Sequence, residues 1–187
     1  MKNNCNIIAI GGSAGSLEVL LKILPNLKTT LKFAVVIVLH RKKTSDTTLL
    51  DLLNSRTDLP VREVEDKDII TAGTIFIAPP DYHLLAESNN TFSLDYSEKI
   101  NYSRPSIDPT FETIADVYKK NALAILLSGA NADGVNGLKA IKNNGGVVIV
   151  QNPETAEVPY MPEQAILNVD VNYVLNVDQI IEFINGL

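Results

Sequence analysis

The chain has 187 residues, 45% of them hydrophobic and 20% charged, and its formal net charge is -6 at pH 7. This length and composition predict one folded globular domain, and the acidic balance argues against a nucleic-acid-binding protein, which needs clustered Lys and Arg to contact phosphates. The single cysteine, Cys5, cannot form an intrachain disulfide, and no apolar run reaches the roughly 20 residues that span a bilayer, so we expect a cytoplasmic protein without membrane insertion.

In the first part of the chain, apolar runs of strand length alternate with segments of helical periodicity. The run FAVVIVLH is β-branched and apolar on both faces, which is typical of a strand buried in a parallel sheet. A helix capped by Ser45 or Asp46 is expected after it. The expected strands are 6–10, 33–40, 61–64 and 74–78, and the expected helices are 16–24 and 45–56.

The middle of the chain interrupts this alternation. Residues 83–87 and 91–96 flank the turn sequence SNN and predict an antiparallel hairpin. A helix follows within RPSIDPTFETIADVYKK, where Asp108 is expected as the cap and Pro109 as the first helical residue.

The last part returns to alternating strands and helices. Its expected elements are buried strands at 123–128 and 147–151 with a helix at 137–144 between them, followed by the segments 161–168, 173–175 and 177–186. We therefore predict fold class α/β, with a doubly wound, mainly parallel sheet, helices on both faces and an antiparallel hairpin at one edge. The whole of residues 1–187 is expected to form one domain.

The glycine-rich loop after the first strand lies at the functional edge of such a sheet, because ligands bind where the C-terminal ends of parallel strands meet. Its residues Gly11-Gly12-Ser13-Ala14-Gly15 match G-x-S-x-G, in which small residues permit a tight turn that exposes the serine. The loop lacks the glycine spacing of a dinucleotide fingerprint and the lysine of a P-loop. Ser13 is interpreted as a nucleophile or, alternatively, as a cap of the following helix.

A serine nucleophile needs a base, and the chain contains two histidines, His40 and His83. His40 ends a buried strand and shares the sheet edge with Ser13, so it is the preferred base. Asp133 follows another buried strand and has two interpretations, as the carboxylate that orients the histidine or as a helix cap. The chain order Ser, His, Asp differs from that of α/β-hydrolases, chymotrypsin-like proteases and subtilisins.

With these residues the chain resembles the catalytic domain of the chemotaxis protein-glutamate methylesterases, the CheB family. The segment IIAIGGSAGS corresponds to the serine loop of the family, VIVLH to its histidine strand, and LLSGANADGVNG to its aspartate loop. IFIAPPDYHL, SRPSIDPTF and MPEQAI resemble three further family blocks, so the likeness covers essentially the whole chain. The chain departs from the family at Ala14-Gly15-Ser16, at Leu39 and at Ala130, where Thr-Gly-Gly, Gln and Met are usual.

The resemblance implies hydrolysis of glutamate methyl esters on cytoplasmic helices of chemoreceptors, with release of methanol, and in some members deamidation of glutamine. It assigns Ser13 as nucleophile, His40 as general base and then acid, and Asp133 as the partner of His40. The backbone N–H groups of Ala130 and Ala14 are expected to bind the oxyanion. No cofactor or metal is implied.

The partners implied are methylated receptor helices, with a receptor methyltransferase or kinase domains of a signalling assembly as further candidates. Many family members carry an N-terminal receiver domain, which is not expected here because Ser13 lies so close to residue 1. A second interpretation from a different class is a non-catalytic sensory or scaffold module that keeps the fold and binds receptor-like helices.

Four residues are candidates for the substrate cleft, namely Arg104, His83, Tyr160 and Met161. Arg104 lies in the polar segment SRPSID, and a structural ion pair is the preferred alternative to a place at the lip of the cleft. For His83, a supporting polar role is preferred to a catalytic one.

Overall fold

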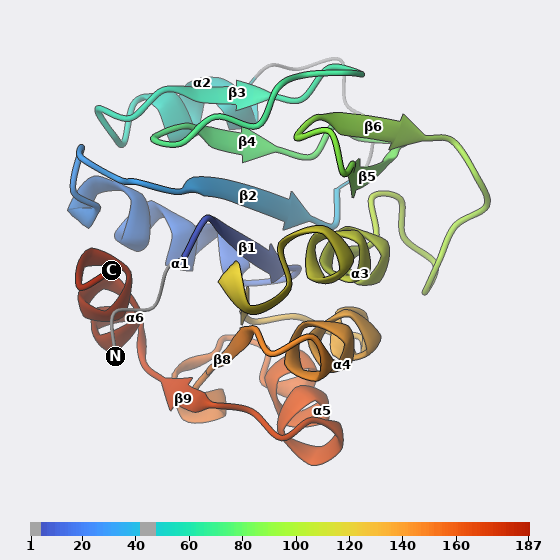
Figure 1. Ribbon diagram of the computed structural model, residues 1–187. Helices are drawn as coiled ribbons and strands as arrows, with labels where there is room; N and C mark the ends of the chain where they lie inside the picture. The colour runs from blue at the N-terminus through green and yellow to red at the C-terminus, as the bar shows by residue number, and fades with distance from the viewer. Residues whose placement is uncertain (1–4, 42–47) are drawn as a thin grey trace.

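The computed structural model describes residues 5–41 and 48–187. Within these residues, a seven-stranded sheet runs through the molecule in the order β3-β4-β2-β1-β7-β8-β9, and every neighbouring pair is parallel (Figure 1). The strands are β1 (Ile7–Gly12), β2 (Ala34–Leu39), β3 (Val61–Glu63), β4 (Ile75–Ile77), β7 (Ala122–Leu126), β8 (Val147–Gln151) and β9 (Tyr173–Leu175). Every residue of β1, β2 and β7 is buried, as expected for central strands that are covered on both faces.

Helices cover both faces of this sheet, which confirms the predicted doubly wound fold (Figure 1). They are α1 (Ser16–Ile23), α2 (Thr48–Asn54), α3 (Ile107–Tyr118), α4 (Val135–Asn143), α5 (Tyr160–Asn168) and α6 (Val177–Asn185), with short 3-10 turns at Leu24–Asn26, Lys119–Asn121 and Pro153–Thr155. No helix among the described residues is both long and apolar enough to cross a membrane.

Alternate residues of β1 divide the core into two apolar clusters. Ile7 and Ala9 pack in the cluster that contains α3, α4 and α5, whereas Ile8 and Ile10 pack in the cluster that contains α1, α2 and α6. This division follows from the two-residue period of a strand, whose successive side chains point to opposite faces. Both faces of the strand need an apolar cover, so the sequence shows no polar alternation.

The predicted hairpin is present as β5 (His83–Ala86) and β6 (Phe92–Asp95), paired antiparallel. It differs from the expectation in one respect, because it forms a two-stranded sheet of its own, while β3 and β9 form the edges of the large sheet. Two threonines of α3 hydrogen-bond its backbone, Thr110 Oγ1 donating to Leu84 O at 2.7 Å and Thr113 Oγ1 accepting from Ala86 N–H at 3.1 Å. These helix side chains satisfy backbone groups that pairing with the large sheet would otherwise satisfy.

The prediction for the start of α3 was wrong by two residues. The helix begins at Ile107 with Ser106 in the N-cap position, and Asp108 lies in its first turn. The carboxylate of Asp108 accepts a hydrogen bond from the Gly137 N–H of α4 at 2.8 Å, so it links two helices instead of capping its own. The predicted caps of α2, Ser45 and Asp46, lie outside the described residues.

Candidate active site

The C-terminal ends of β1, β2 and β7 lie side by side and are tied by backbone hydrogen bonds. Ser13 directly follows β1, and its N–H donates to Ser128 O, just after β7, at 2.9 Å. His40 directly follows β2, and its N–H donates to Gly12 O at 3.2 Å. The parallel order β2-β1-β7 thus brings the serine and histidine loops, and the loop that carries Asp133, to one edge of the sheet.

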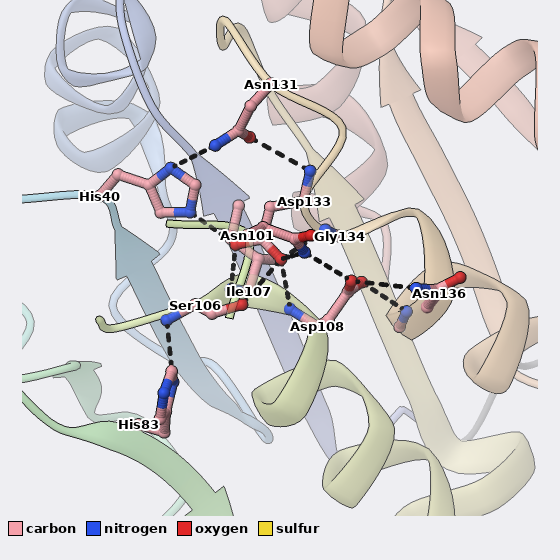
Figure 2. A network of polar contacts seen from close by, with 11 residues as sticks. His40, His83, Asn101, Ser106, Ile107, Asp108, Asn131, Asp133, Gly134 and Asn136 are labelled. Atoms are coloured by element: carbon pink, nitrogen blue, oxygen red, sulfur yellow. Dashed lines mark hydrogen bonds and ion pairs between the residues drawn. The ribbon is translucent and has the colours of Figure 1, made fainter. Parts of the chain in front are cut away.

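Figure 2 shows His40 and Asp133 pointing toward each other from two of these loops. His40 Nε2 lies 2.6 Å from Asp133 Oδ2. The histidine side chain is 10% exposed and the aspartate side chain is fully buried. A short hydrogen bond of this kind fixes the orientation of the imidazole ring and leaves Nδ1 as its second polar atom.

The carboxylate of Asp133 is held by the first turn of α3. Its Oδ2 accepts from Ile107 N–H at 2.7 Å, and its Oδ1 accepts from Asp108 N–H at 3.1 Å and from Ser106 Oγ at 2.8 Å. The N-terminus of a helix offers unpaired N–H groups and a positive dipole end, so it favours a carboxylate there.

Two further contacts complete the environment of this carboxylate. Asp133 Oδ1 also accepts from Asn101 Nδ2 at 3.0 Å and from Gly134 N–H at 3.0 Å. Burial by itself raises the pKa of Asp133, but the hydrogen bonds from His40, Ile107 and Ser106 and the charge of His40 outweigh it and lower the pKa below the ordinary value. Asp133 is therefore a carboxylate that accepts hydrogen bonds.

A second buried carboxylate, Asp108, lies beside the first. Asn101 Nδ2 donates to Asp108 Oδ2 at 3.1 Å and so bridges the two aspartates. Burial raises the pKa of Asp108, the Gly137 N–H opposes this shift, and the negative charge of Asp133 raises the pKa further. The pKa values of the two neighbouring aspartates are thus shifted in opposite directions, because Asp133 has more hydrogen-bond donors around it and a histidine partner.

The loop that carries Ser13 is held tightly by small residues. Gly15 has φ +79°, and a Cβ at this position would lie 2.6 Å from Glu157 Cβ and 2.8 Å from Ser128 Oγ. Gly15 is also the N-cap residue of α1, which has no side-chain cap hydrogen bond, so the structure does not support Ser13 as a helix cap. The Ser13 hydroxyl makes no hydrogen bond within residues 5–41 and 48–187, His40 included.

The alternative interpretation of Asp133 as a helix cap is not supported either. The N-cap residue of α4 is Gly134, again without a side-chain cap hydrogen bond. Both oxygens of Asp133 are directed instead to α3, Asn101, Gly134 and His40.

Two exposed residues lie in the loops that meet at Ser13. Ala14 and Ala130 are both exposed, and neither N–H has a hydrogen-bond partner among the described residues. A Cβ built at Gly129 would lie 3.1 Å from Ser13 Cβ, so the backbone just before Ala130 lies against the serine. Both N–H groups are therefore available to a ligand close to Ser13.

A cavity of about 350 Å³ opens beside His40. Its lining residues are His40, Arg41, Asp81, Lys99, Tyr102, Ser103 and Arg104. Of the predicted cleft residues only Arg104 contributes to this lining, and Ser13 does not. Arg104 makes no ion pair among the described residues; Nη1 donates to Ser97 O at 2.7 Å and Tyr96 O at 3.2 Å, and the guanidinium lies 3.9 Å from the Tyr96 ring centroid.

The other three predicted cleft residues lie elsewhere. His83 is fully buried; its Nδ1 accepts from Ser106 N–H at 3.2 Å and its Nε2 lies 3.0 Å from Glu98 O, so it supports the residue that binds Asp133. Met161 is fully buried, and its N–H donates to Gly129 O at 2.9 Å. Tyr160 is 47% exposed but does not line the cavity.

Sequence reasoning missed two asparagines of the network, Asn101 and Asn131 (Figure 2). The spacing Asn-x-Asp in NAD carries a usable signal for Asn131, because an asparagine side chain often accepts from the backbone N–H two residues on. For Asn101 we find no such signal, since its partners Asp108 and Asp133 lie 7 and 32 residues away. No group of three His, Cys, Asp or Glu side chains within the described part of the chain is placed to hold a metal ion.

Comparison with known proteins matches this chain to one family. The family described as CheB methylesterase matches residues 8–184. A provisionally named protein-glutamate methylesterase/protein-glutamine glutaminase of Leptospira interrogans is 44% identical over 179 residues, which cover 96% of this chain and 93% of the relative. The protein-glutamate methylesterase/protein-glutamine glutaminase of Thermotoga maritima is 37% identical over 172 residues, covering 90% of this chain but 50% of the longer relative.

The fold agrees as well. The crystal structure of the Thermotoga maritima CheB methylesterase catalytic domain superimposes with a TM-score of 0.93 at 35% sequence identity, covering 97% of this chain and 98% of that one. The matches in sequence and in structure both extend over nearly the whole chain. The chain belongs to the CheB methylesterase family.

Proposed function

We propose that this chain is a serine esterase that hydrolyses glutamate methyl esters of chemoreceptors, with Ser13, His40 and Asp133 as its catalytic residues. The observation that carries the proposal is the 2.6 Å contact of His40 Nε2 with Asp133, a carboxylate held by the N-terminus of α3. The loop of Ser13 lies at the neighbouring strand end, and its hydroxyl is not engaged by any other described group.

The contact supports one distribution of protons before the reaction. Because Asp133 is a carboxylate, it accepts from His40 Nε2–H, and a neutral imidazole then has an unprotonated Nδ1. Nδ1 is therefore the base in this proposal, and the reaction requires the Ser13 hydroxyl to approach it within about 2.6–3.2 Å.

In the first half of the reaction, Ser13 Oγ bonds to the ester carbonyl carbon and its proton passes to His40 Nδ1. The tetrahedral intermediate then collapses, the bond to the methoxy oxygen breaks, and Nδ1 returns the proton so that methanol leaves. A water molecule repeats the sequence on the acyl-serine, giving the glutamate carboxyl group and free Ser13. Asp133 stabilises the imidazolium of both steps.

The N–H groups of Ala14 and Ala130, which have no partner among the described residues, are suited to the oxyanion of these intermediates. They belong to loops that meet at Ser13, and backbone donors can serve irrespective of the side chain at position 130. Removing one such donor typically costs a factor of about 10² to 10³ in turnover.

The cavity beside His40 is suited to an acidic protein substrate. Three cationic side chains line it, Arg41, Lys99 and Arg104, against the single carboxylate of Asp81. Arg41 is partly neutralised by an ion pair with Glu63, which leaves Lys99 and Arg104 to attract acidic side chains near the ester. Receptor helices that carry glutamates around a methylation site have the negative charge that these cations would attract. Glutamine at such a site would be the substrate of a glutaminase activity.

Methanol release from a methylated receptor tests the proposal. Ser13→Ala and His40→Ala should each abolish it while the far-ultraviolet circular dichroism stays that of the wild type. A fluorophosphonate should label the wild type at Ser13 and should leave His40→Ala unlabelled, since attack needs an activated hydroxyl. Full methanol release by either variant contradicts the proposal.

One observation favours a second candidate, a non-catalytic module that binds receptor-like helices: the Ser13 hydroxyl makes no hydrogen bond to His40. The same labelling experiment separates the two candidates. A folded wild-type protein that the fluorophosphonate does not label, but that binds the receptor, would establish the binding module.

A further inference from the structure

Asn131 lies between the backbone of Asp133 and the ring of His40 (Figure 2). Its Oδ1 accepts from Asp133 N–H at 3.1 Å, and its Nδ2 lies 3.5 Å from His40 Nδ1. The side chain is partly buried, in the loop between β7 and α4. It therefore contacts the nitrogen of His40 that Asp133 does not contact.

The first of these contacts fixes which way the amide points. A backbone N–H can only donate, so the atom of Asn131 that faces Asp133 N–H must be the oxygen. The other end, which faces His40, is then the NH₂ group, and it can only donate. The Nδ1 atom it faces is compatible with this donor only when Nδ1 carries no proton.

Both ends of the imidazole thus specify the same tautomer. Asp133 presents an acceptor to Nε2, which favours a proton there, and Asn131 presents a donor to Nδ1, which disfavours a proton there. With Nδ1 protonated, the amide and the ring would place two donors against each other. To avoid that, the amide would have to turn and give up Asp133 N–H.

We propose that Asn131 is a positioning residue that keeps His40 Nδ1 unprotonated and correctly oriented, so that it can take the proton of Ser13. This inference rests on the proposed function, in which Nδ1 is the base. The 3.5 Å contact is long, so a serine hydroxyl at about 2.6–3.2 Å would be the closer donor to the same lone pair. Asn131 would bias the ring without blocking the reaction.

The substitution Asn131→Asp separates this role from a purely structural one. An aspartate is the same size and keeps an oxygen for Asp133 N–H, so the turn is preserved, but it presents an acceptor to Nδ1 in place of a donor. It should draw a proton onto Nδ1 and lower kcat for methanol release at least about tenfold, with KM changed less than about twofold. Asn131→Ser keeps an oxygen for Asp133 N–H but lacks the NH₂ group that faces His40 Nδ1, and should lower kcat by about two- to tenfold.

The matched control is Ala132→Asp. Ala132 is exposed and adjacent, so this substitution adds the same charge to the same loop at a solvent-exposed position. The variant should retain wild-type kcat within about twofold. Circular dichroism and thermal unfolding of each variant identify any loss that comes from misfolding.

Nitrogen-15 NMR of the imidazoles reads the tautomer directly, with His40→Gln used to assign the signals. At the pH of the methanol-release assay, the wild type should show an unprotonated Nδ1 and a protonated Nε2, and Asn131→Asp should show a protonated Nδ1. A protonated Nδ1 in the wild type overturns the inference, as does wild-type kcat in Asn131→Asp. If the wild type releases no methanol while the spectra change as expected, the proposed function fails and the role of Asn131 in setting the tautomer stands.

Discussion

Replacing Asp133 by asparagine changes one oxygen of the network into an NH₂ group at nearly constant volume. In the wild type, Oδ1 accepts from four donors and Oδ2 accepts from two, His40 Nε2 and Ile107 N–H. An NH₂ group cannot accept a hydrogen bond, so the introduced asparagine should place it where fewer donors point. That is the position of Oδ2, which faces two donors, not that of Oδ1, which faces four. His40 Nε2 must then act as an acceptor, which moves the ring proton to Nδ1 and removes the proposed base.

The structural cost of Asp133→Asn follows from the same contacts. Ile107 N–H loses its acceptor, Asp133 Oδ2, and a buried unpaired donor costs about 1–3 kcal/mol. The remaining hydrogen bonds lose the assistance of the negative charge, and the helix N-terminus loses its carboxylate, which contributes about 0.3–2 kcal/mol more. The free energy of unfolding should therefore fall by about 1–5 kcal/mol.

The loss in catalysis should be larger than the loss in stability. A wrong histidine tautomer in a serine–histidine–aspartate site lowers kcat by about 10⁴. Methanol release measures kcat, and urea unfolding followed by circular dichroism measures stability, because the chain contains no tryptophan. Asp116→Asn, which changes an exposed carboxylate of α3, serves as the control and should stay within about 0.5 kcal/mol of the wild type. If Asp133→Asn keeps kcat within tenfold of the wild type, the reasoning from the Asp133–His40 contact is refuted.

Three further predictions follow from the same structure. The pKa of Asp133 is lower in the folded protein than its ordinary 3.8, so its carboxylate stabilises the fold above that pH, and this contribution is lost as the pH falls through the folded value. The difference in unfolding free energy between wild type and Asp133→Asn should therefore shrink in acid. Parallel plots of unfolding free energy against pH for the two proteins would contradict this. Gly129→Ala would place a Cβ 2.6 Å from Met161 Cε and 3.1 Å from Ser13 Cβ. The serine should therefore shift, and fluorophosphonate labelling should slow at least about tenfold. An unchanged labelling rate would contradict this and show that the loop adapts. Burial raises the pKa of the Cys5 thiol to about 12, so iodoacetamide at pH 8 should alkylate the folded protein far more slowly than the urea-unfolded chain; equal rates would disprove the assignment.

Much of the fold could be predicted because its signals are local. The apolar runs of β1, β2, β7 and β8 are too continuous for one-sided strands, and the helical segments between them require parallel connections. Ser13 and His40 each follow such a strand directly, so their presence at one sheet edge follows from the chain order alone. The position of Asp133 after β7 extends the same argument.

Other features depend on contacts between distant segments and could not be read from the pattern. Backbone groups of the hairpin are hydrogen-bonded by Thr110 and Thr113 of α3, and the period-two pattern of the strands does not reveal these partners. Asp108 looked like a cap in its own segment, but Gly137 and Asn101 bind it from elsewhere. For His83 the sequence suggested a supporting polar role near the cleft, but not that the side chain is fully buried and accepts from Ser106 N–H.

The sequence by itself determined the α/β class, the parallel core and the strand ends that carry a hydroxyl, an imidazole and a carboxylate. Only the tertiary structure decided that Asp133 lies at the N-terminus of α3, which nitrogen of His40 it binds, and that Asn131 faces the other nitrogen. The physical reason is that hydrophobic periodicity is a property of neighbouring residues, whereas a hydrogen-bond network is set by which loops meet after the sheet has formed.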